Sequence, residues 1–237
     1  MKKLITAEDV LSELKKMADP EKVISKEKKF GITTSNSLGI YIKDLKALAK
    51  QVKKSDELAF ELFESDVYEA KVLIPFFFNP KSITPELIEQ WIASFNTWEI
   101  CDTYCMSFMG QSQYAYDKIF EYVNHKNEFQ KRAGFVLMVG HHFGHKNAPN
   151  TDFEAFLPII KSQATDERNF VKKAVNWALR TIGKRNKDLN KLALTTAHEI
   201  LTLDSKSAQW IAKDAIKELE SPKVNIQDYP RSIYRPK

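Results

Sequence analysis

The chain has 237 residues, of which 43% are hydrophobic and 28% are charged, a balance typical of an ordinary globular protein. Seven glycines and nine prolines are few for this length and disfavour an all-β fold with many tight turns, while the formal charge of +5 is compatible with a polyanionic partner. No apolar run approaches the roughly 20 residues of a membrane span, and the opening MKKLITAEDVL turns acidic before a signal-peptide core could form, so we expect a cytoplasmic protein without membrane contact.

Helix signals follow one another along the chain. In TPELIEQWIASF, Thr84 is an expected N-cap and Pro85 stands at the first helical position. Asn96 is expected to cap the next helix, with Glu99 in capping-box position and Gly110 just past the helix end. The other expected helices cover residues 7–17, 37–53, 56–64, 67–78, 113–123, 128–142, 152–162, 167–184, 187–202 and 206–220. No stretch alternates like a β-strand, so the fold class is predicted to be all-α.

A repeat is visible in the second half of the chain. The segment FQKRA begins at Phe129, FVKKA at Phe170 and IAKDA at Ile211, which are 41 residues apart both times. A period of roughly 40–47 residues with helices throughout is typical of HEAT-like or armadillo-like stacking, in which neighbouring helix pairs bury each other's apolar faces. The sequence therefore predicts a curved α-solenoid of antiparallel helix pairs. One domain would cover residues 1–220, followed by a basic tail, 221–237.

The repeat also aligns basic residues. Equivalent positions of successive units lie side by side in a solenoid, so Lys131, Lys172 and Lys213 are expected to form a row. Arg132 and Lys173 would join this row. Stacked basic side chains on a concave face suit a phosphate backbone, although solvated helix faces of no special function remain an alternative.

A carboxylate and two tryptophans form a second candidate set. Trp98 and Asp102 are four residues apart and share one helix face, with Cβ atoms roughly 5–6 Å apart. Trp177 and Arg180 lie three residues apart on a later helix. A carboxylate beside indole faces can stabilise a transient sugar cation of the kind formed in glycosidic cleavage. A base that is already cationic would need no general acid. The alternative is that both tryptophans belong to the core and that Asp102 makes a surface hydrogen bond.

The order and spacing of several stretches resemble a known family. They are FGITTSNSLGIYIKDLKALAKQVKK, ELAFELFESDVYEAKVL, TWEICDTY, FQKRAGFVL and NFVKKAVNWALRTIGKRN. Together, over roughly residues 20–220, they are similar to the AlkD-type DNA alkylation repair family of HEAT-like-repeat glycosylases.

That resemblance implies roles for particular residues. Asp102 matches the catalytic aspartate, Trp98 and Trp177 match aromatics beside the deoxyribose of the lesion, and Arg132 matches an arginine at the DNA backbone. Members of this kind excise 3-methyl- and 7-methylpurines from double-stranded DNA without flipping the base. By this resemblance the protein is a DNA-alkylpurine glycosylase. We expect it to act as a monomer, associated with the nucleoid when bound to DNA, and we count Arg180 among the DNA-binding residues.

Other residues are weaker candidates. His141, His142 and His145 gather near an expected helix end, where histidines also cap carbonyls, so no metal is expected. Cys101 and Cys105 flank Asp102 and are expected to be packing residues. No cofactor is expected. A non-catalytic HEAT-like scaffold that binds nucleic acid or protein through its basic concave face is the competing function.

Overall fold

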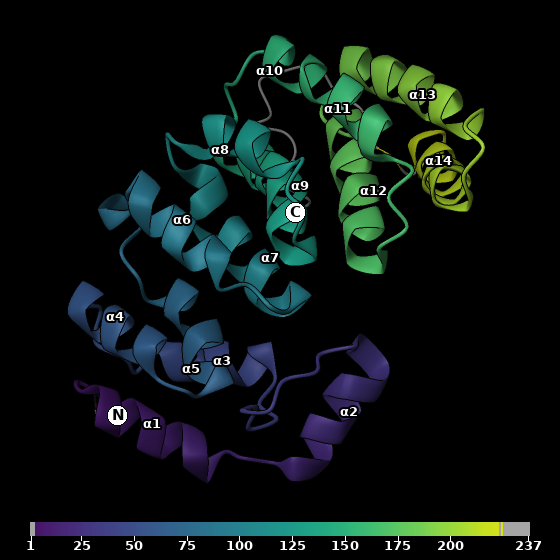
Figure 1. The fold of residues 1–237 in the computed structure, drawn as a ribbon. Coiled ribbons are helices and arrows are strands. Elements are labelled where there is room, and N and C mark those ends of the chain that lie inside the picture. Colours follow the sequence, from purple (N-terminus) through teal and green to yellow (C-terminus); the bar gives the residue numbers. More distant parts are fainter. Residues whose placement is uncertain (1–2, 223, 225–237) are drawn as a thin grey trace.

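The computed structural model describes residues 3–222 and 224, and helices make up most of this part of the chain (Figure 1). Its N-terminal half contains α1 (Ala7–Lys16), α2 (Pro20–Phe30), α3 (Ile42–Ala49), α4 (Asp56–Glu64), α5 (Tyr68–Leu73), η1 (Ile74–Phe76), η2 (Pro80–Ser82), α6 (Pro85–Ala93) and α7 (Trp98–Ser107). The C-terminal half contains η3 (Met109–Gln111), α8 (Ala115–Tyr122), α9 (Glu128–Gly144), α10 (Asn150–Glu154), α11 (Phe156–Gln163), α12 (Asn169–Gly183), α13 (Lys187–Leu201) and α14 (Lys206–Leu219). No strand occurs among these described residues, so the all-α prediction is confirmed.

The helices stack as a solenoid. Helices α7, α9, α12 and α14 pack side by side in one row, while α8 packs on α9, α11 lies beside α12 and α13 packs on α14. The three copies of the 41-residue repeat fall on α9, α12 and α14, which are neighbours. The Phe129 and Phe170 rings, which open the first two copies, lie 5.4 Å apart. The predicted stacking of repeat units is therefore confirmed.

A constant register joins the neighbouring helices of this row. The guanidinium of Arg132 donates to the carbonyl oxygen of a residue 38 positions later, Phe170. The next interface repeats this offset, since Asn176 donates to Asp214 and Arg180 donates to Glu218, each 38 positions on. Because each helix meets the next in the same register, the surface of one unit continues onto the following one.

Close backbone packing accounts for the glycine that follows α7. The helix ends at Ser107 rather than at the expected Gly110, and Gly110 lies in η3. A Cβ at Gly110 would stand 2.5 Å from the Cα of Gly140 on α9, so this glycine is needed for a close approach of two backbones.

At the other end of the helix, Thr97 rather than Asn96 is the N-cap and accepts from the N–H of Ile100.

The largest departure from the expected helices lies between residues 20 and 41. Helix α2 was not predicted, and the predicted helix 37–53 begins only at Ile42. The Glu69 carboxylate accepts hydrogen bonds from the backbone N–H groups of Leu38, Gly39 and Ile40, which holds this segment in a non-helical form. Gly39 has a φ of 78°, a left-handed conformation that glycine adopts without strain.

Prolines account for two further corrections. The expected helix 152–162 is split into α10 and α11, since Pro158 has no N–H to donate to the carbonyl of Glu154. Within the expected helix 67–78, α5 gives way to the 3₁₀ turn η1, where Pro75 stands. Both segments were predicted to be helical at the right residues, but each was predicted as one unbroken helix.

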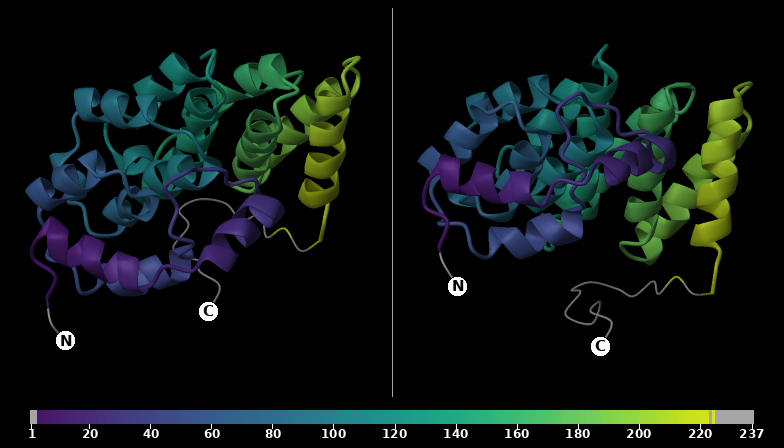
Figure 2. Two further views of the ribbon diagram at one scale, coloured as in Figure 1. Left: turned by 60° about the horizontal axis from the view of Figure 1, so that its bottom comes forward. Right: turned by 90° about the horizontal axis from the view of Figure 1, so that it is seen from below.

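Helix α2 is held by a buried charge. Among its 11 residues, Lys26 is the only one that is buried. The Lys26 ammonium lies 2.9 Å from the Glu99 carboxylate on α7 and donates to the carbonyl of Ile40 at 3.1 Å. The Tyr68 hydroxyl also donates to Glu99, at 2.9 Å. Polar contacts therefore dock α2, and Figure 2 shows how this helix reaches toward the C-terminal half of the array.

None of the described helices is long and apolar enough to cross a membrane. Residues 223 and 225–237 of the predicted basic tail lie outside the described residues.

Replacing Lys26 with methionine is expected to lower the free energy of unfolding by about 3–5 kcal/mol, because it leaves the buried Glu99 without its cation. Urea denaturation measures this change. Lys28→Met, at an exposed position of the same helix, is the control and should change stability by less than about 0.5 kcal/mol. Similar losses for the two variants would contradict the docking role of Lys26.

Candidate functional site

A cavity of about 450 Å³ lies where α2, α7, α9 and α12 meet. The residues that line it are Lys29, Phe30, Gly31, Trp98, Asp102, Arg132, Asn169, Phe170 and Lys173. They come from the C-terminal end of α2, one face of α7, and the first two turns of α9 and of α12. Residues far apart in the chain thus form one site, and it contains three of the residues predicted from sequence to act together: Trp98, Asp102 and Arg132.

Asp102 and Arg132 form a bidentate ion pair in this cavity. The Arg132 Nε donates to Asp102 Oδ1 at 2.8 Å, and Nη2 donates to Oδ2 at 2.7 Å. The remaining nitrogen, Nη1, donates to the backbone carbonyl of Phe170 at 2.6 Å. The Asp102 side chain is 18% exposed and that of Arg132 is 7% exposed. The pair therefore fixes the orientation of the carboxylate, because the planar guanidinium permits little rotation.

Burial and the ion pair act in opposite directions on these groups. Burial raises the pKa of the Asp102 carboxyl, and the charge and hydrogen bonds of Arg132 offset only part of that rise. Desolvation disfavours the charged guanidinium of Arg132, yet the neighbouring Asp102 outweighs it and raises the pKa of Arg132. The carboxylate is thus held in a water-poor place, where its charge acts more strongly on a nearby cation than it would in water.

Aromatic side chains form the walls beside this pair. The indole N–H of Trp98 donates to the backbone carbonyl of Phe30 at 2.8 Å, so the end of α2 fixes the ring. Phe30 itself is 46% exposed, and Phe170 lines the opposite side on α12. Sequence reasoning missed both phenylalanines. Phe170 opens a copy of the repeat, which was the available signal. Phe30 lies in KKFGI, residues 28–32, which from the sequence could be either a DNA-contacting loop or a turn between helices.

The later tryptophan and arginine lie elsewhere. Trp177 stands one turn beyond Lys173 on α12, is half-buried against the core and does not line this cavity. Arg180 pairs with Glu218, and its Nε lies 3.5 Å from Asp214. Its guanidinium therefore forms ion pairs that join α12 to α14. The structure therefore does not bring Trp177 and Arg180 together with Asp102 around this cavity.

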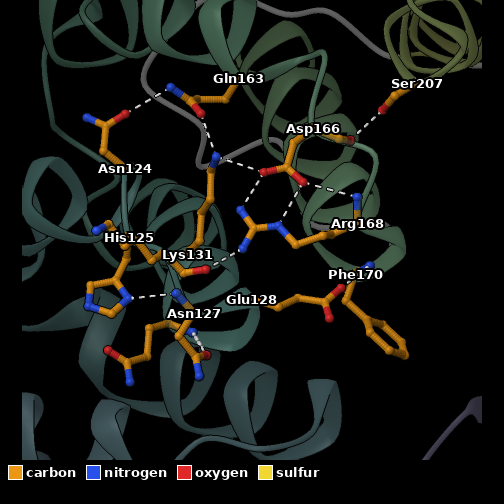
Figure 3. Close-up of polar contacts among 12 residues, drawn as sticks. Asn124, His125, Asn127, Glu128, Lys131, Gln163, Asp166, Arg168, Phe170 and Ser207 are labelled. Atoms are coloured by element: carbon orange, nitrogen blue, oxygen red, sulfur yellow. Dashed lines mark hydrogen bonds and ion pairs between the residues drawn. The ribbon is translucent and has the colours of Figure 1, made fainter.

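Lys131 lies in a network that connects α9 with the residues before α12 (Figure 3). Its ammonium is buried and donates to the Asp166 carboxylate at 2.8 Å and to Gln163 at 2.6 Å. Arg168 also donates to Asp166, and the Asp166 carbonyl accepts from Ser207 on α14. The structure therefore places Lys131 outside a row of exposed lysines, because its ammonium is buried and ion-paired inside the protein. Lys172, Lys173 and Lys213 remain partly or fully exposed.

The histidines and cysteines are packing residues. His141 stacks on His145 with ring centroids 4.4 Å apart, and its Nε2 lies 3.4 Å from the Asp152 carboxylate. Burial lowers the pKa of His141 to about 4, so the ring is neutral at pH 7. No group of three or more His, Cys, Asp or Glu side chains that could hold a metal occurs among the described residues. Cys101 and Cys105 are buried, as expected.

The fold and this cavity define an all-helical repeat protein with an acidic and aromatic site. The chain belongs to the DNA alkylation repair enzyme family, whose family model matches residues 10–219. An uncharacterized protein of Listeria innocua, Lin0241, is 27% identical over 229 residues, which are 94% of this chain and 100% of that protein. The family predicted from the sequence is confirmed.

Two solved structures share the fold. One belongs to a family of proteins related to the HEAT-like repeat DNA glycosylases with affinity for branched DNA structures. It has a TM-score of 0.73 and 18% identity, and the match covers 94% of this chain and 97% of that one. The other is AlkD2 from Streptococcus mutans, with a TM-score of 0.57 and 22% identity over 85% of this chain and 99% of that one. The HEAT-like solenoid predicted from the repeat is therefore the fold of this protein.

Asp166→Asn is expected to destabilise the protein by ~2 kcal/mol at pH 7, because charge-assisted bonds to Lys131 and Arg168 are lost. Burial alone would raise the pKa of Asp166, but these hydrogen bonds hold the pKa well below its ordinary value of 3.8. The stabilisation is therefore complete above pH 3.8 and declines as the pH falls toward the lower folded pKa. Urea denaturation of both proteins between pH 7 and pH 2 measures the difference. A difference that stays constant below pH 3.8 would contradict this assignment.

Proposed function

We propose that this protein is a DNA glycosylase that excises cationic N3- and N7-alkylated purines from double-stranded DNA. Asp102 supports this proposal most directly: a carboxylate oriented by a bidentate arginine, between aromatic walls, in a member of the DNA alkylation repair enzyme family. A charge fixed in this way needs little reorganisation when a cation forms beside it. It is therefore suited to stabilise a sugar that develops positive charge.

The proposed reaction is hydrolysis of the bond between C1′ of the deoxyribose and N9 of the purine. The bonding electrons go to N9 and neutralise the cationic base, while the oxygen of a water molecule forms a bond to C1′ and releases a proton. Asp102 stabilises the oxocarbenium character of the sugar and orients the water. The Trp98 ring offers its negative π-face to the same cation. Arg132 positions Asp102 rather than acting on the substrate itself.

The number of acidic residues in the cavity supports cationic alkylated purines as the lesion. Of the described residues that line the cavity, Asp102 alone is acidic. A neutral purine needs a proton from a general acid to become a good leaving group, whereas an N3- or N7-alkylated purine leaves as a neutral molecule without one. A single carboxylate is therefore sufficient for cationic lesions. Because that carboxylate acts at the sugar, the base need not enter a pocket of its own.

DNA binding is assigned to exposed cations beside the cavity. Lys29 and Lys173 line it from opposite sides, on α2 and α12, and both are exposed. Lysines in such positions can contact the phosphates of the strand that carries the lesion. In this proposal the protein acts as a cytoplasmic monomer, on the nucleoid when bound to DNA, and needs no cofactor.

A DNA-binding scaffold without catalytic activity is the second candidate. The observation that favours it is that both oxygens of Asp102 already accept hydrogen bonds from Arg132. A structurally related protein of this fold has affinity for branched DNA structures. In the scaffold, Asp102 would serve to hold α7 against α9. Base release from alkylated DNA separates the two candidates.

Asp102→Asn is expected to slow the release of 7-methylguanine by about 10²–10³-fold, since the amide keeps the shape of the side chain but removes the charge that stabilises the sugar cation. Single-turnover base release from methylated duplex DNA measures this rate. Burial raises the pKa of Asp102 above 3.8, so the wild-type rate should also fall as the pH falls through that pKa. The variant has no carboxylate at this position, and its rate should not show this fall.

DNA affinity serves as the control, because removing a carboxylate should not weaken binding to phosphates. A melting curve of the variant shows whether the loss of the ion pair disturbs the fold. If the folded variant releases 7-methylguanine at the wild-type rate, the carboxylate is structural and the scaffold replaces the enzyme.

Lys173→Ala is expected to weaken binding to duplex DNA of any sequence, because one phosphate contact is lost. The slope of log affinity against log salt concentration should become shallower by about 0.9. Titrations at several salt concentrations measure it. Lys191→Ala, which removes an exposed lysine of α13, is the matched control and should leave the slope unchanged. Equal slopes for all three proteins would remove Lys173 from the DNA interface.

A further inference from the structure

Trp210 on α14 is an exposed aromatic that the proposed reaction does not use. It is 41% exposed, whereas Trp91 is fully buried in the core. The repeat places it with respect to the cavity. Asn169 lines the cavity on α12, and Trp210 occupies the equivalent position 41 residues later, on the neighbouring helix α14. Since the units stack in a constant register, the surface that lines the cavity on α12 continues to Trp210.

Lysines surround this ring. On α14, Lys206, Lys213 and Lys217 lie four residues before, three after and seven after Trp210, so that all four share one helix face. All three lysines are exposed. From α12, the Lys172 ammonium lies over the indole, 5.1 Å from the ring centroid. This cation–π contact orients the ring while 41% of the residue stays in contact with solvent.

The nearby carboxylates are already neutralised. Asp214 accepts from Asn176 at 2.6 Å and lies 3.5 Å from Arg180. Glu218 pairs with Arg180 and, at 2.7 Å, with Lys184. Within the described part of the chain, no carboxylate lies in ion-pair distance of Lys172, Lys206, Lys213 or Lys217. The face around Trp210 therefore carries a net positive charge that its neighbours do not balance.

The chemistry of this face selects one class of ligand. An aromatic ring among unpaired cations matches the flat face of a nucleobase and the phosphates on either side of it. A base in the interior of a duplex cannot stack on Trp210, since its two faces are already stacked on the neighbouring bases, so an unpaired base fits this face. Lys172 on this face is adjacent in the chain to Lys173 at the cavity, so one DNA molecule can span both places.

We propose that Trp210 stacks on an unpaired nucleobase in a single-stranded arm or gap that continues from the duplex at the cavity, with Lys172, Lys206 and Lys213 contacting its phosphates. The protein would thereby recognise duplex DNA that adjoins a single-stranded segment. This inference rests on the proposed DNA binding but not on the proposed base excision.

Affinity for two unmodified DNA molecules tests the inference: a plain duplex, and the same duplex with a single-stranded arm. Trp210→Ala should bind the arm-bearing DNA about 10-fold more weakly than wild type, and Trp210→Phe should keep most of the affinity, because base stacking needs a ring. Both variants should bind the plain duplex within about twofold of wild type. Phe120→Ala, which removes an exposed ring of α8, is the matched control and should change neither affinity.

Tryptophan fluorescence gives a second readout that does not depend on the alanine variant being folded. The arm-bearing DNA should quench wild-type emission more than the plain duplex does, and this difference should disappear in Trp210→Phe. Equal losses of affinity for the two DNA molecules, or an unchanged difference in quenching, would overturn the stacking role. If the wild type shows no preference for the arm, the face does not bind unpaired DNA and its partner is of another kind.

Base release from a methylated plain duplex keeps this inference separate from the proposed reaction. Trp210→Ala should release 7-methylguanine at the wild-type rate. If wild-type protein releases no base yet prefers the arm, the glycosylase proposal fails and the stacking site stands. If it releases base but shows no preference, the reverse holds.

Discussion

The docking of α2 through one buried ammonium is the constraint on which the site depends. Lys26 is the only buried residue of this helix, so its contacts to Glu99 and to the Ile40 carbonyl replace the apolar packing that holds most helices. Glu99 adjoins Trp98, and the Trp98 indole in turn donates to the carbonyl of Phe30 at the end of α2. One polar network thus sets both the position of α2 and the orientation of the ring that faces the cavity.

Arg132 connects the site to the solenoid in a similar way. Its guanidinium holds Asp102 on α7 and the Phe170 carbonyl on α12, so the carboxylate is fixed by the same contacts that set the register between repeat units. A geometry of this kind is preorganised, because the stacking of the helices rather than the substrate orders it. It also explains why a basic residue of the repeat, which suggests DNA contact in the sequence, is buried in the structure.

Much of the architecture was predictable from local rules. The 41-residue period beginning at Phe129, the N-cap at Thr84 and the spacing of Trp98 and Asp102 indicated the solenoid and the core of the site, because they depend on neighbours within one helix or one repeat. Helix α2 escaped prediction since its single buried residue is a lysine, which no apolar periodicity reveals. The segment before Ile42 escaped because a carboxylate 30 residues away, that of Glu69, binds its backbone.

The sequence by itself determined the all-α repeat fold, the family and the helix face that carries Asp102. Only the tertiary structure decided which charged side chains are exposed and free to contact a ligand. Lys131 and Lys172 occupy equivalent positions of the repeat, yet the first is buried against Asp166 and the second lies over Trp210. Trp177 was expected at the site but does not line the cavity, whereas Phe30, which was not expected there, does line it. The physical reason is that exposure and ion pairing depend on side chains contributed by other helices, which spacing along one helix does not specify.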